Sequence, residues 1–134
     1  MERTYIMTKP DAYKRGLVGQ IITRIENKGY KIVNMKMMNL DEEILKEHYA
    51  HLADKPFFKD IVSYMTSGPV VGMIVEGENA VEGMRRLMGP TDGFEALPGT
   101  IRGDFSYNKS ENLIHGSDCT ENAEIEIKRF FGEN

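Results

Sequence analysis

The spacing of apolar and polar residues along the chain predicts a series of strands and helices. Residues 5–8 form a short strand-prone run, which Pro10 ends because proline cannot donate to a ladder. Over residues 18–25 the apolar positions recur at helical spacing, and Gly29 supplies a stop. Residues 32–40 then show the period of two that is typical of a half-buried strand. The apolar positions of that strand are Val33, Met35 and Met37.

A pair of helices is predicted next. Asp41 can cap the first of them, which contains His48, and residues 54–56 break it. A shorter helical stretch follows over residues 57–65. The two helices together form a helical hairpin inserted between strands.

The middle of the chain predicts a central strand and a long loop. Residues 70–75 are continuously apolar, which is typical of a strand covered on both faces. Asn79 can cap the following helix, which Gly89 ends. Residues 89–111 are rich in glycine and proline without sustained periodicity, which predicts a long irregular loop of the functional kind. Residues 112–115 resemble a last short strand.

The end of the chain completes the fold prediction. A final helix is marked by Ala123, Ile127, Phe130 and Phe131. The order of elements matches the βαββαβ plan of ferredoxin-like α+β folds, with an inserted helical hairpin and a C-terminal helix. We expect an antiparallel sheet with its helices on one face. A doubly wound parallel sheet fits less well, because the connection between the second and third strands already contains two helices.

Composition narrows the class of protein. The length of 134 residues predicts one domain over residues 1–134, and the 40% apolar and 28% charged contents are typical of folded globular chains. The 17 Lys and Arg are outnumbered by 21 Asp and Glu, and the net charge of −4 argues against a nucleic-acid-binding module. An anionic ligand therefore needs a local cluster of basic residues.

The cysteine content and the chain's apolar runs bear on its location. Cys119 is the single cysteine and cannot form an internal disulfide, which favours a reducing compartment. The start of the chain has no basic segment followed by an apolar run, and no stretch reaches the ~20 apolar residues that cross a bilayer. We expect a cytoplasmic protein that does not associate with membranes.

Several common chemical signatures are absent or weak. No two glycines lie two positions apart, which excludes the dinucleotide fingerprint, and a P-loop is also missing. His48 and His51 lie three apart on a predicted helix, a spacing that could ligate a metal, but the usual hydrolytic glutamate is missing. We interpret both as surface or hairpin histidines.

His115 is the strongest candidate for chemistry. It ends an apolar strand and precedes the small-residue turn Gly116-Ser117-Asp118, which would leave its imidazole at a sheet edge. A lone strand-end histidine is more often structural than catalytic. Glu126, however, shares a helix face with Ala123 and Phe130, and an inward carboxylate needs a partner. Pairing with His115 would fix the imidazole tautomer and make the opposite nitrogen more nucleophilic, although periodicity equally allows a solvent-facing Glu126.

Three isolated basic residues lie near the ends of predicted elements, where they could hold a phosphate. They are Lys9, Arg85 and Arg102. Any one of them alone is more often a solvated surface charge than a ligand contact. Both interpretations therefore remain open at each position.

Residues 112–118, Asn-Leu-Ile-His-Gly-Ser-Asp, resemble the active-site signature of nucleoside diphosphate kinases. Further segments resemble that family in the same order along the chain. They are Thr8-Lys9-Pro10-Asp11, Arg15-Gly16-Leu17-Val18-Gly19, Glu47-His48-Tyr49, Lys55-Pro56-Phe57-Phe58, Ser67-Gly68-Pro69-Val70 and Pro98-Gly99-Thr100-Ile101-Arg102-Gly103-Asp104. The resemblance extends from Arg3 to Phe131.

The resemblance implies a specific reaction. The γ-phosphoryl group of a nucleoside triphosphate, typically ATP, would pass reversibly to a nucleoside diphosphate by a ping-pong route through a phosphohistidine on His115. Neutral imidazole suits this step because it is nucleophilic near pH 7 without losing a proton. Phe57 matches the aromatic residue on which the base stacks, and stacking alone implies broad base specificity. We expect Phe58 in the core instead.

The resemblance also implies a set of substrate contacts. Residues that match them are Lys9, Tyr49, Phe57, Arg85, Thr91, Arg102 and Asn112. Lys9 and Asn112 would reach the ribose hydroxyls, and Lys9 would also lie near the γ-phosphate. The two arginines and the threonine would hold phosphate oxygens.

Other matched residues surround the histidine. Tyr49 would place its hydroxyl near His115, and Ser117 and Glu126 would orient the imidazole. The resemblance implies a Mg²⁺ ion that bridges the nucleotide phosphates, with Asp118 contacting it through water.

The chain differs from many members of that family at two places. Asp92-Gly93 stands after Thr91 where many members have Asn-Pro, and loss of a rigid proline is expected to loosen the long loop. The sequence ends at Asn134 without the longer tail that many members fold over a neighbouring subunit. The family forms hexamers or tetramers of a common dimer, and we favour the homohexamer.

Two hypotheses compete with the enzyme. A regulatory or scaffold protein could keep the nucleotide-binding residues for sensing, and a ferredoxin-like domain could bind small metabolites at its sheet edge without phosphoryl transfer. A sensor would need no nucleophile. The presence of His115 and Glu126 together with the three basic residues therefore favours turnover.

Overall fold

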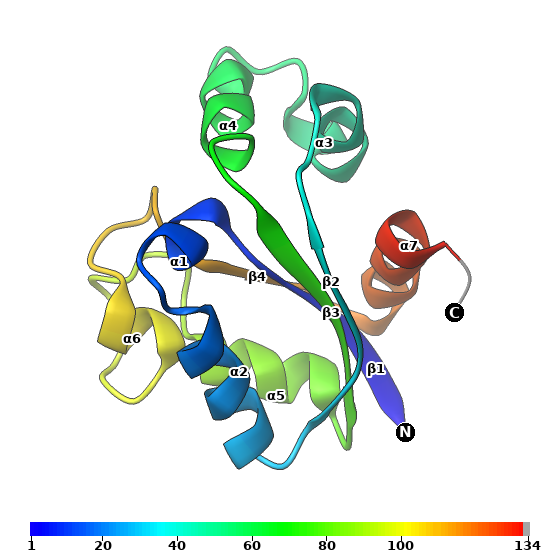
Figure 1. Ribbon diagram of the computed structural model, residues 1–134, viewed down its shortest axis with the longest axis vertical. Coiled ribbons are helices and arrows are strands. Elements are labelled where there is room, and N and C mark those ends of the chain that lie inside the picture. The colour runs from blue at the N-terminus through cyan, green and yellow to red at the C-terminus, as the bar shows by residue number, and fades with distance from the viewer. Residues whose placement is uncertain (133–134) are drawn as a thin grey trace.

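The computed structural model describes residues 1–132, and Glu133 and Asn134, the last residues of the expected domain, lie outside the described part. Its four strands form an antiparallel sheet in the order β2-β3-β1-β4 (Figure 1). The bounds are Glu2–Thr8 for β1, Lys31–Met38 for β2, Val70–Gly77 for β3 and Ile114–Gly116 for β4. This arrangement confirms the expected α+β, ferredoxin-like class.

The helices include two that the periodicity does not predict. Helix α1, Pro10–Lys14, begins where the sequence pattern predicts only the end of a strand, and α6, Ile101–Phe105, lies inside the predicted irregular loop. Each has five residues, too few for apolar spacing to reveal. The predicted helices are observed as α2 (Val18–Asn27), α3 (Glu42–His48), α4 (Phe58–Met65), α5 (Ala80–Met88) and α7 (Thr120–Phe131), with the 3₁₀ turn η1 (Ala50–Leu52) after α3.

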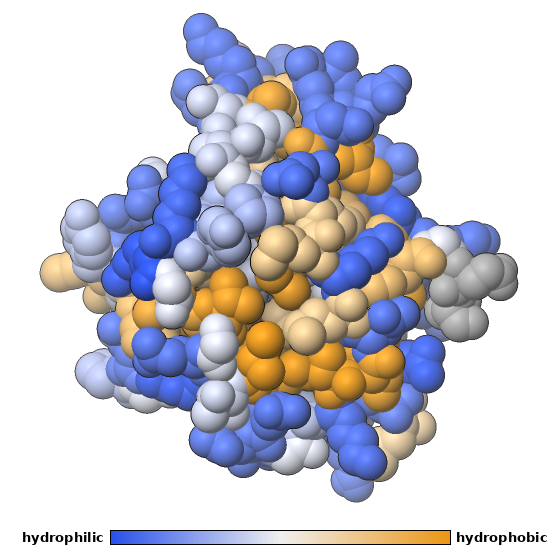
Figure 2. Space-filling model, viewed as in Figure 1, coloured by the Kyte–Doolittle hydropathy of each residue, from blue (hydrophilic) through white to orange (hydrophobic). Residues whose placement is uncertain are grey.

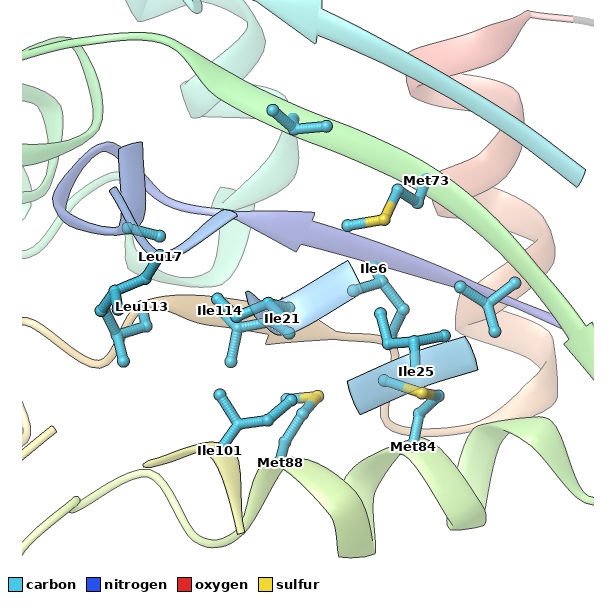
Figure 3. Packing of buried hydrophobic residues seen from close by; sticks show 13 residues of the cluster. Ile6, Leu17, Ile21, Ile25, Met73, Met84, Met88, Ile101, Leu113 and Ile114 are labelled. Atoms are coloured by element: carbon cyan, nitrogen blue, oxygen red, sulfur yellow. The ribbon is translucent and has the colours of Figure 1, made fainter. Parts of the chain in front are cut away.

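Helices cover both faces of the sheet, so the expectation of helices on one face is wrong (Figure 1). On one face α2 and α5 pack around a cluster that includes Ile6 and Met84 (Figure 3). On the other face α7 and the α3–α4 hairpin pack around Met7 and Phe130. Successive strand residues point to opposite faces, and β1 is therefore buried without a break over residues 4–8. The inserted hairpin and the last helix together form the second layer.

The predicted burial is confirmed for one of the two strands with the clearest apolar patterns and is wrong for the other. β3 lies between β2 and β1 and is buried along most of its length, which confirms the predicted central strand. β2 is an edge strand, and Val33, Met35 and Met37 are 42%, 48% and 60% exposed. The expectation that these residues are half-buried is therefore wrong. Figure 2 shows apolar residues gathered at the surface on the side of the molecule where β2 lies.

The starts of α3 and α5 show which of the predicted capping residues form a cap. Asp41 caps α3 as predicted, because its carboxylate accepts a hydrogen bond from the Ile44 amide at 3.0 Å. Asn79 is wrong as a side-chain cap, since it adopts a left-handed φ of 50° and its side chain makes no capping hydrogen bond. The carboxylate of Glu2 accepts from the Val81 amide instead, at 2.9 Å. None of the helices within residues 1–132 has the length and apolar character required to cross a membrane.

The long loop is held at the place where the sequence predicts loosening. The Gly93 amide donates to the Asn108 carbonyl at 3.2 Å, and the Asp92 side chain accepts from the Phe94 amide at 3.1 Å. A Cβ atom on Gly93 would lie 2.4 Å from the Ser106 carbonyl oxygen. Glycine at this position therefore permits a close backbone contact that proline or alanine would block.

Candidate active site

A cleft of about 1260 Å³ opens between α3, α5, β4 and α7. Most of the site residues expected from the sequence line it. These are Lys9, Tyr49, Arg85, Thr91, Arg102, Asn112, His115, Asp118 and Glu126. Ser117 is buried beneath the residues that line the cleft and donates a hydrogen bond to Glu126. Basic side chains gather in the cleft although the chain carries a net negative charge, and carboxylates line it as well. The cations are Lys9, Arg85, Arg86, Arg102 and Arg129.

His115 is positioned by the short strand β4. It pairs with Met7 of β1, while its neighbours Ile114 and Gly116 are buried. A Cβ atom on Gly116 would lie 2.6 Å from the Met88 sulfur, so glycine lets the strand approach α5. The His115 side chain therefore faces the layer that contains α7.

The predicted pairing of His115 with Glu126 is present. Nε2 of the imidazole lies 2.8 Å from Oε1 of Glu126, and Ser117 Oγ donates to the same oxygen at 2.7 Å. An ionised carboxylate only accepts hydrogen bonds, so Nε2 carries a proton, and in the neutral form of the imidazole Nδ1 keeps the unshared electron pair. Within residues 1–132, no group hydrogen-bonds to Nδ1. This is the arrangement of an oriented nucleophile.

Opposing effects keep Glu126 ionised. Burial alone would raise the pKa of its carboxyl group, but the hydrogen bonds from His115 and Ser117 and the nearby His115 charge outweigh burial and hold the pKa below its usual value. The side chains of His115 and Glu126 are only 20% and 13% exposed. The pair is thus screened little by water.

Lys9 and Asn112 meet at the end of β1. Lys9 Nζ donates to Asn112 Oδ1 at 2.7 Å, and the Lys9 amide donates to the Leu113 carbonyl at 2.8 Å. Burial, followed by the neighbouring positive charge of Arg102, lowers the pKa of Lys9 to about 8, and Asp11 partly opposes this shift. Lys9 is therefore mostly protonated at pH 7, but it loses its proton at a lower pH than an ordinary lysine.

Arg102 has a structural function that the sequence does not reveal. Its guanidinium is buried and donates to the backbone carbonyls of Gly89, Asn112 and Ile114. Burial and then Arg85 lower its pKa to about 10, with Tyr64 opposing. The residue thus joins the loop after α5 to β4 and remains positively charged at pH 7. Two of its five N–H groups stay available for a ligand.

The remaining site residues divide into exposed and buried groups. Arg85 and Thr91 are exposed at the mouth of the cleft. Phe57 is 48% exposed just before α4, while Phe58 is buried in the core, as the sequence predicts. Burial, followed by the charge of Glu126, raises the pKa of Tyr49 to about 12, so its hydroxyl stays a donor.

Asp118 is ionised at the cleft. Asn122 Nδ2 donates to its carboxylate at 2.6 Å, and this hydrogen bond holds the pKa of Asp118 below its usual value. An exposed carboxylate that lines the cleft fits a hydrated hard cation such as Mg²⁺, whose preferred ligands are oxygen atoms and water.

His48 corrects the sequence interpretation. It is 7% exposed, and its ring centroid lies 4.7 Å from that of His115. His48 does lie in the inserted hairpin, at the end of α3, but the interpretation as a surface histidine is wrong for it and holds for His51, which is exposed. The signal was its spacing of three from Leu45, which is fully buried on the same helix face.

These observations define a small α+β protein in which a histidine, oriented by a largely buried carboxylate, lies in a cleft that gathers basic side chains able to hold an anionic group. The nucleoside diphosphate kinase family model matches residues 2–134. The chain therefore belongs to the nucleoside diphosphate kinase family, and it is a phosphotransferase.

Named relatives and solved structures match this chain over nearly its full length. The nucleoside diphosphate kinase of Acetivibrio thermocellus is 55% identical over 99% of this chain and 98% of its own. That of Ignicoccus hospitalis is 56% identical over 100% of this chain and 91% of its own. The apo enzyme of Encephalitozoon cuniculi has a TM-score of 0.95 at 48% identity, covering 99% and 90% of the two chains. The Halobacterium salinarum enzyme in complex with CDP has a TM-score of 0.94 at 52% identity, covering 98% and 88%.

Proposed function

We propose that the protein transfers the γ-phosphoryl group of a nucleoside triphosphate, typically ATP, reversibly to a nucleoside diphosphate through a phosphohistidine on His115. The observation that carries the proposal is the 2.8 Å contact between His115 Nε2 and Glu126. It places the proton on Nε2 and leaves Nδ1 to attack the γ-phosphorus, with the first diphosphate as leaving group. The second diphosphate then attacks the phosphohistidine, which returns the imidazole to its starting state.

The cations of the cleft supply the electrostatic part of catalysis. Phosphoryl transfer depends mainly on position and charge stabilisation, and Lys9, Arg85 and Arg102 line the same cleft as His115. We assign Arg85, Thr91 and Arg102 to the phosphate oxygens. Lys9 and Asn112, which share a 2.7 Å hydrogen bond, are assigned to the ribose hydroxyls, with Lys9 also near the γ-phosphate.

We assign separate residues to the nucleotide base and to the hydroxyl donor beside His115. Phe57 offers an exposed ring for stacking, and a stacked base gives broad specificity because every base has a π face. The adjacent Phe58 anchors this end of α4 in the core. Tyr49 keeps its proton at neutral pH and is the hydroxyl donor that we assign beside His115.

A divalent cation, which we propose to be Mg²⁺, enters with the nucleotide. Bound to the phosphates, it neutralises part of their charge. The ionised carboxylate of Asp118 fits an indirect contact through water.

We also propose a homo-oligomer, with a hexamer favoured over a tetramer. Support comes from edge strand β2, whose exposed Val33, Met35 and Met37 form an apolar surface that solvent disfavours. The proposed unit is one domain over residues 1–134 acting in the cytoplasm, where its single cysteine needs no partner. Its acidic balance gives no reason to expect nucleic acid as a partner.

Incubation with γ-labelled ATP tests the reaction. We expect an acid-labile, base-stable label on the wild-type chain that a nucleoside diphosphate removes. His115→Ala should abolish labelling while nucleotide binding is largely kept. His51→Ala should label normally, because His51 also lines the cleft but is exposed and its side chain makes no hydrogen bond within the described residues. A wild-type chain that binds ATP without becoming labelled would instead be a nucleotide sensor.

A further inference from the structure

A second histidine lies against the nucleophile without a part in the proposed reaction. His48 is buried at the end of α3, and its ring meets that of His115 edge to face, at 4.7 Å between centroids and 79° between planes. The Phe130 ring closes another side at 5.1 Å. Such a polar ring inside a core needs a reason, because burial of unpaired polar groups costs stability.

Arg129 determines where the His48 proton lies. Its Nη1 is 2.8 Å from Nδ1 of His48, and its Nε donates to Glu47 at 3.1 Å. A guanidinium can only donate, so Nδ1 of His48 must accept and Nε2 must carry the proton. That Nε2 is buried and has no hydrogen-bond partner within the described residues.

The cluster has the composition of a metal site, but its protons argue against that use. One ligand atom from each of His48, His115 and Glu126 lies within 4.8 Å of the others. A metal ion on Nε2 of His48 would require the proton to move to Nδ1, where it would face the N–H groups of Arg129. A metal would also displace the hydrogen bond between His115 and Glu126.

Neutrality is the second property of this ring. Burial, with His115 and then Arg129 acting in the same direction, lowers the pKa of His48 to about 3, while Glu126 opposes. A permanently neutral ring packs against the nucleophile without adding a positive charge, which would compete with it for Glu126. Its locked tautomer also leaves a buried N–H group in the cluster that contains His115 and the ionised Glu126 carboxylate.

We propose that His48, held by Arg129, is a positioning residue that keeps the His115–Glu126 pair in the geometry for phosphoryl transfer. The inference rests on the proposed function and adds to it a residue that acts through His115 instead of contacting substrate. Because small misplacement of a reacting group is costly, loss of this support should slow the chemical step more than it weakens nucleotide binding.

Two substitutions separate the polar role from simple packing. His48→Phe keeps a ring in the core and removes both nitrogens, whereas His48→Gln keeps a donor in place of the Nε2–H. In single-turnover labelling with γ-labelled ATP, we expect His48→Phe to slow phosphohistidine formation about 10- to 100-fold with nucleotide affinity within about twofold. His48→Gln should recover part of that rate. Rates of His48→Phe within about twofold of wild type would overturn the proposal, as would equal losses in both variants.

Substitution of Arg129 gives an independent test of the proposal. Arg129→Met releases the His48 tautomer and should slow labelling in the same way, and its effect should not add to that of His48→Phe. Lys128→Met, an exposed cation one residue earlier on α7, is the matched control. Additive effects would show that the two residues act separately and would contradict the proposal. Absence of label on the wild-type chain would instead refute the proposed function itself.

Discussion

At the scale of single residues, the direction of each hydrogen bond decides where the protons of the cleft lie. Glu126 can only accept, so it holds the proton of His115 on Nε2, and Arg129 can only donate, so it holds the proton of His48 on Nε2 as well. Neither assignment needs a substrate. In the free protein, the neutral imidazole of His115 is therefore already in the tautomer that the proposed reaction requires.

Glu126→Gln tests this assignment. An amide can offer its NH₂ group to His115, which would move the imidazole proton to Nδ1 and remove the nucleophilic electron pair. By analogy with loss of the orienting acid in a catalytic triad, we expect kcat to fall by about 10²- to 10⁴-fold with little change in KM. Glu124→Gln, an exposed neighbour on α7, should behave as wild type. Near-normal turnover in Glu126→Gln would refute the tautomer assignment.

Lys9 predicts an alkaline limit to activity. Its pKa of about 8 means that the free protein carries this charge below about pH 8 and loses it above. Because the cation attracts nucleotide phosphates, kcat/KM should fall as the pH rises through about 8. Lys9→Met should lower kcat/KM throughout and remove that decline, whereas Lys14→Met, an exposed lysine of α1, should retain it. An unchanged alkaline decline in Lys9→Met would assign it to another group.

At the scale of elements, the short helix α6 holds the wall of the cleft. Thr100 caps it by accepting from the Gly103 amide at 2.9 Å, and its Arg102 reaches three backbone carbonyls on the loop and β4. Five residues would not form a stable helix alone. Its tertiary contacts therefore hold it in place.

Gly103→Ala tests how closely this helix is packed. A Cβ atom there would lie 1.9 Å from the Leu97 carbonyl oxygen, a backbone atom that cannot move aside cheaply. We expect the free energy of unfolding to fall by about 1–3 kcal/mol, together with activity, as Arg102 is displaced. Gly19→Ala on α2 has open space and should raise the free energy of unfolding by about 0.5–1 kcal/mol. Urea unfolding of both variants gives the comparison, and equal stability would contradict the packing argument.

At the scale of the whole molecule, the sheet has one apolar edge that the described residues leave open. β2 presents Val33, Met35 and Met37 to solvent, while its inner neighbour β3 is buried. A long apolar edge strand is a surface for pairing. The proposed oligomer accounts for this surface.

Charges placed on that edge should break the assembly. In the double variant Met35→Lys and Met37→Lys, burial of two ammonium groups would oppose association. We expect the mass in solution, measured by analytical ultracentrifugation, to drop to that of smaller species. Asn34→Lys adds a charge to the same strand without removing an apolar contact and should assemble more completely. A monomeric wild-type chain would refute the proposed oligomer.

The sequence by itself determined the strands, the longer helices and the pairing of His115 with Glu126 as a candidate, because periodicity records which face of an element avoids water. It could not say which element would cover that face. Only the tertiary structure placed helices on both sides of the sheet and left β2 at an edge. It also buried His48 against His115 and directed the guanidinium of Arg102 to three backbone carbonyls. Each of these depends on contacts between residues far apart in the chain, which local spacing does not encode.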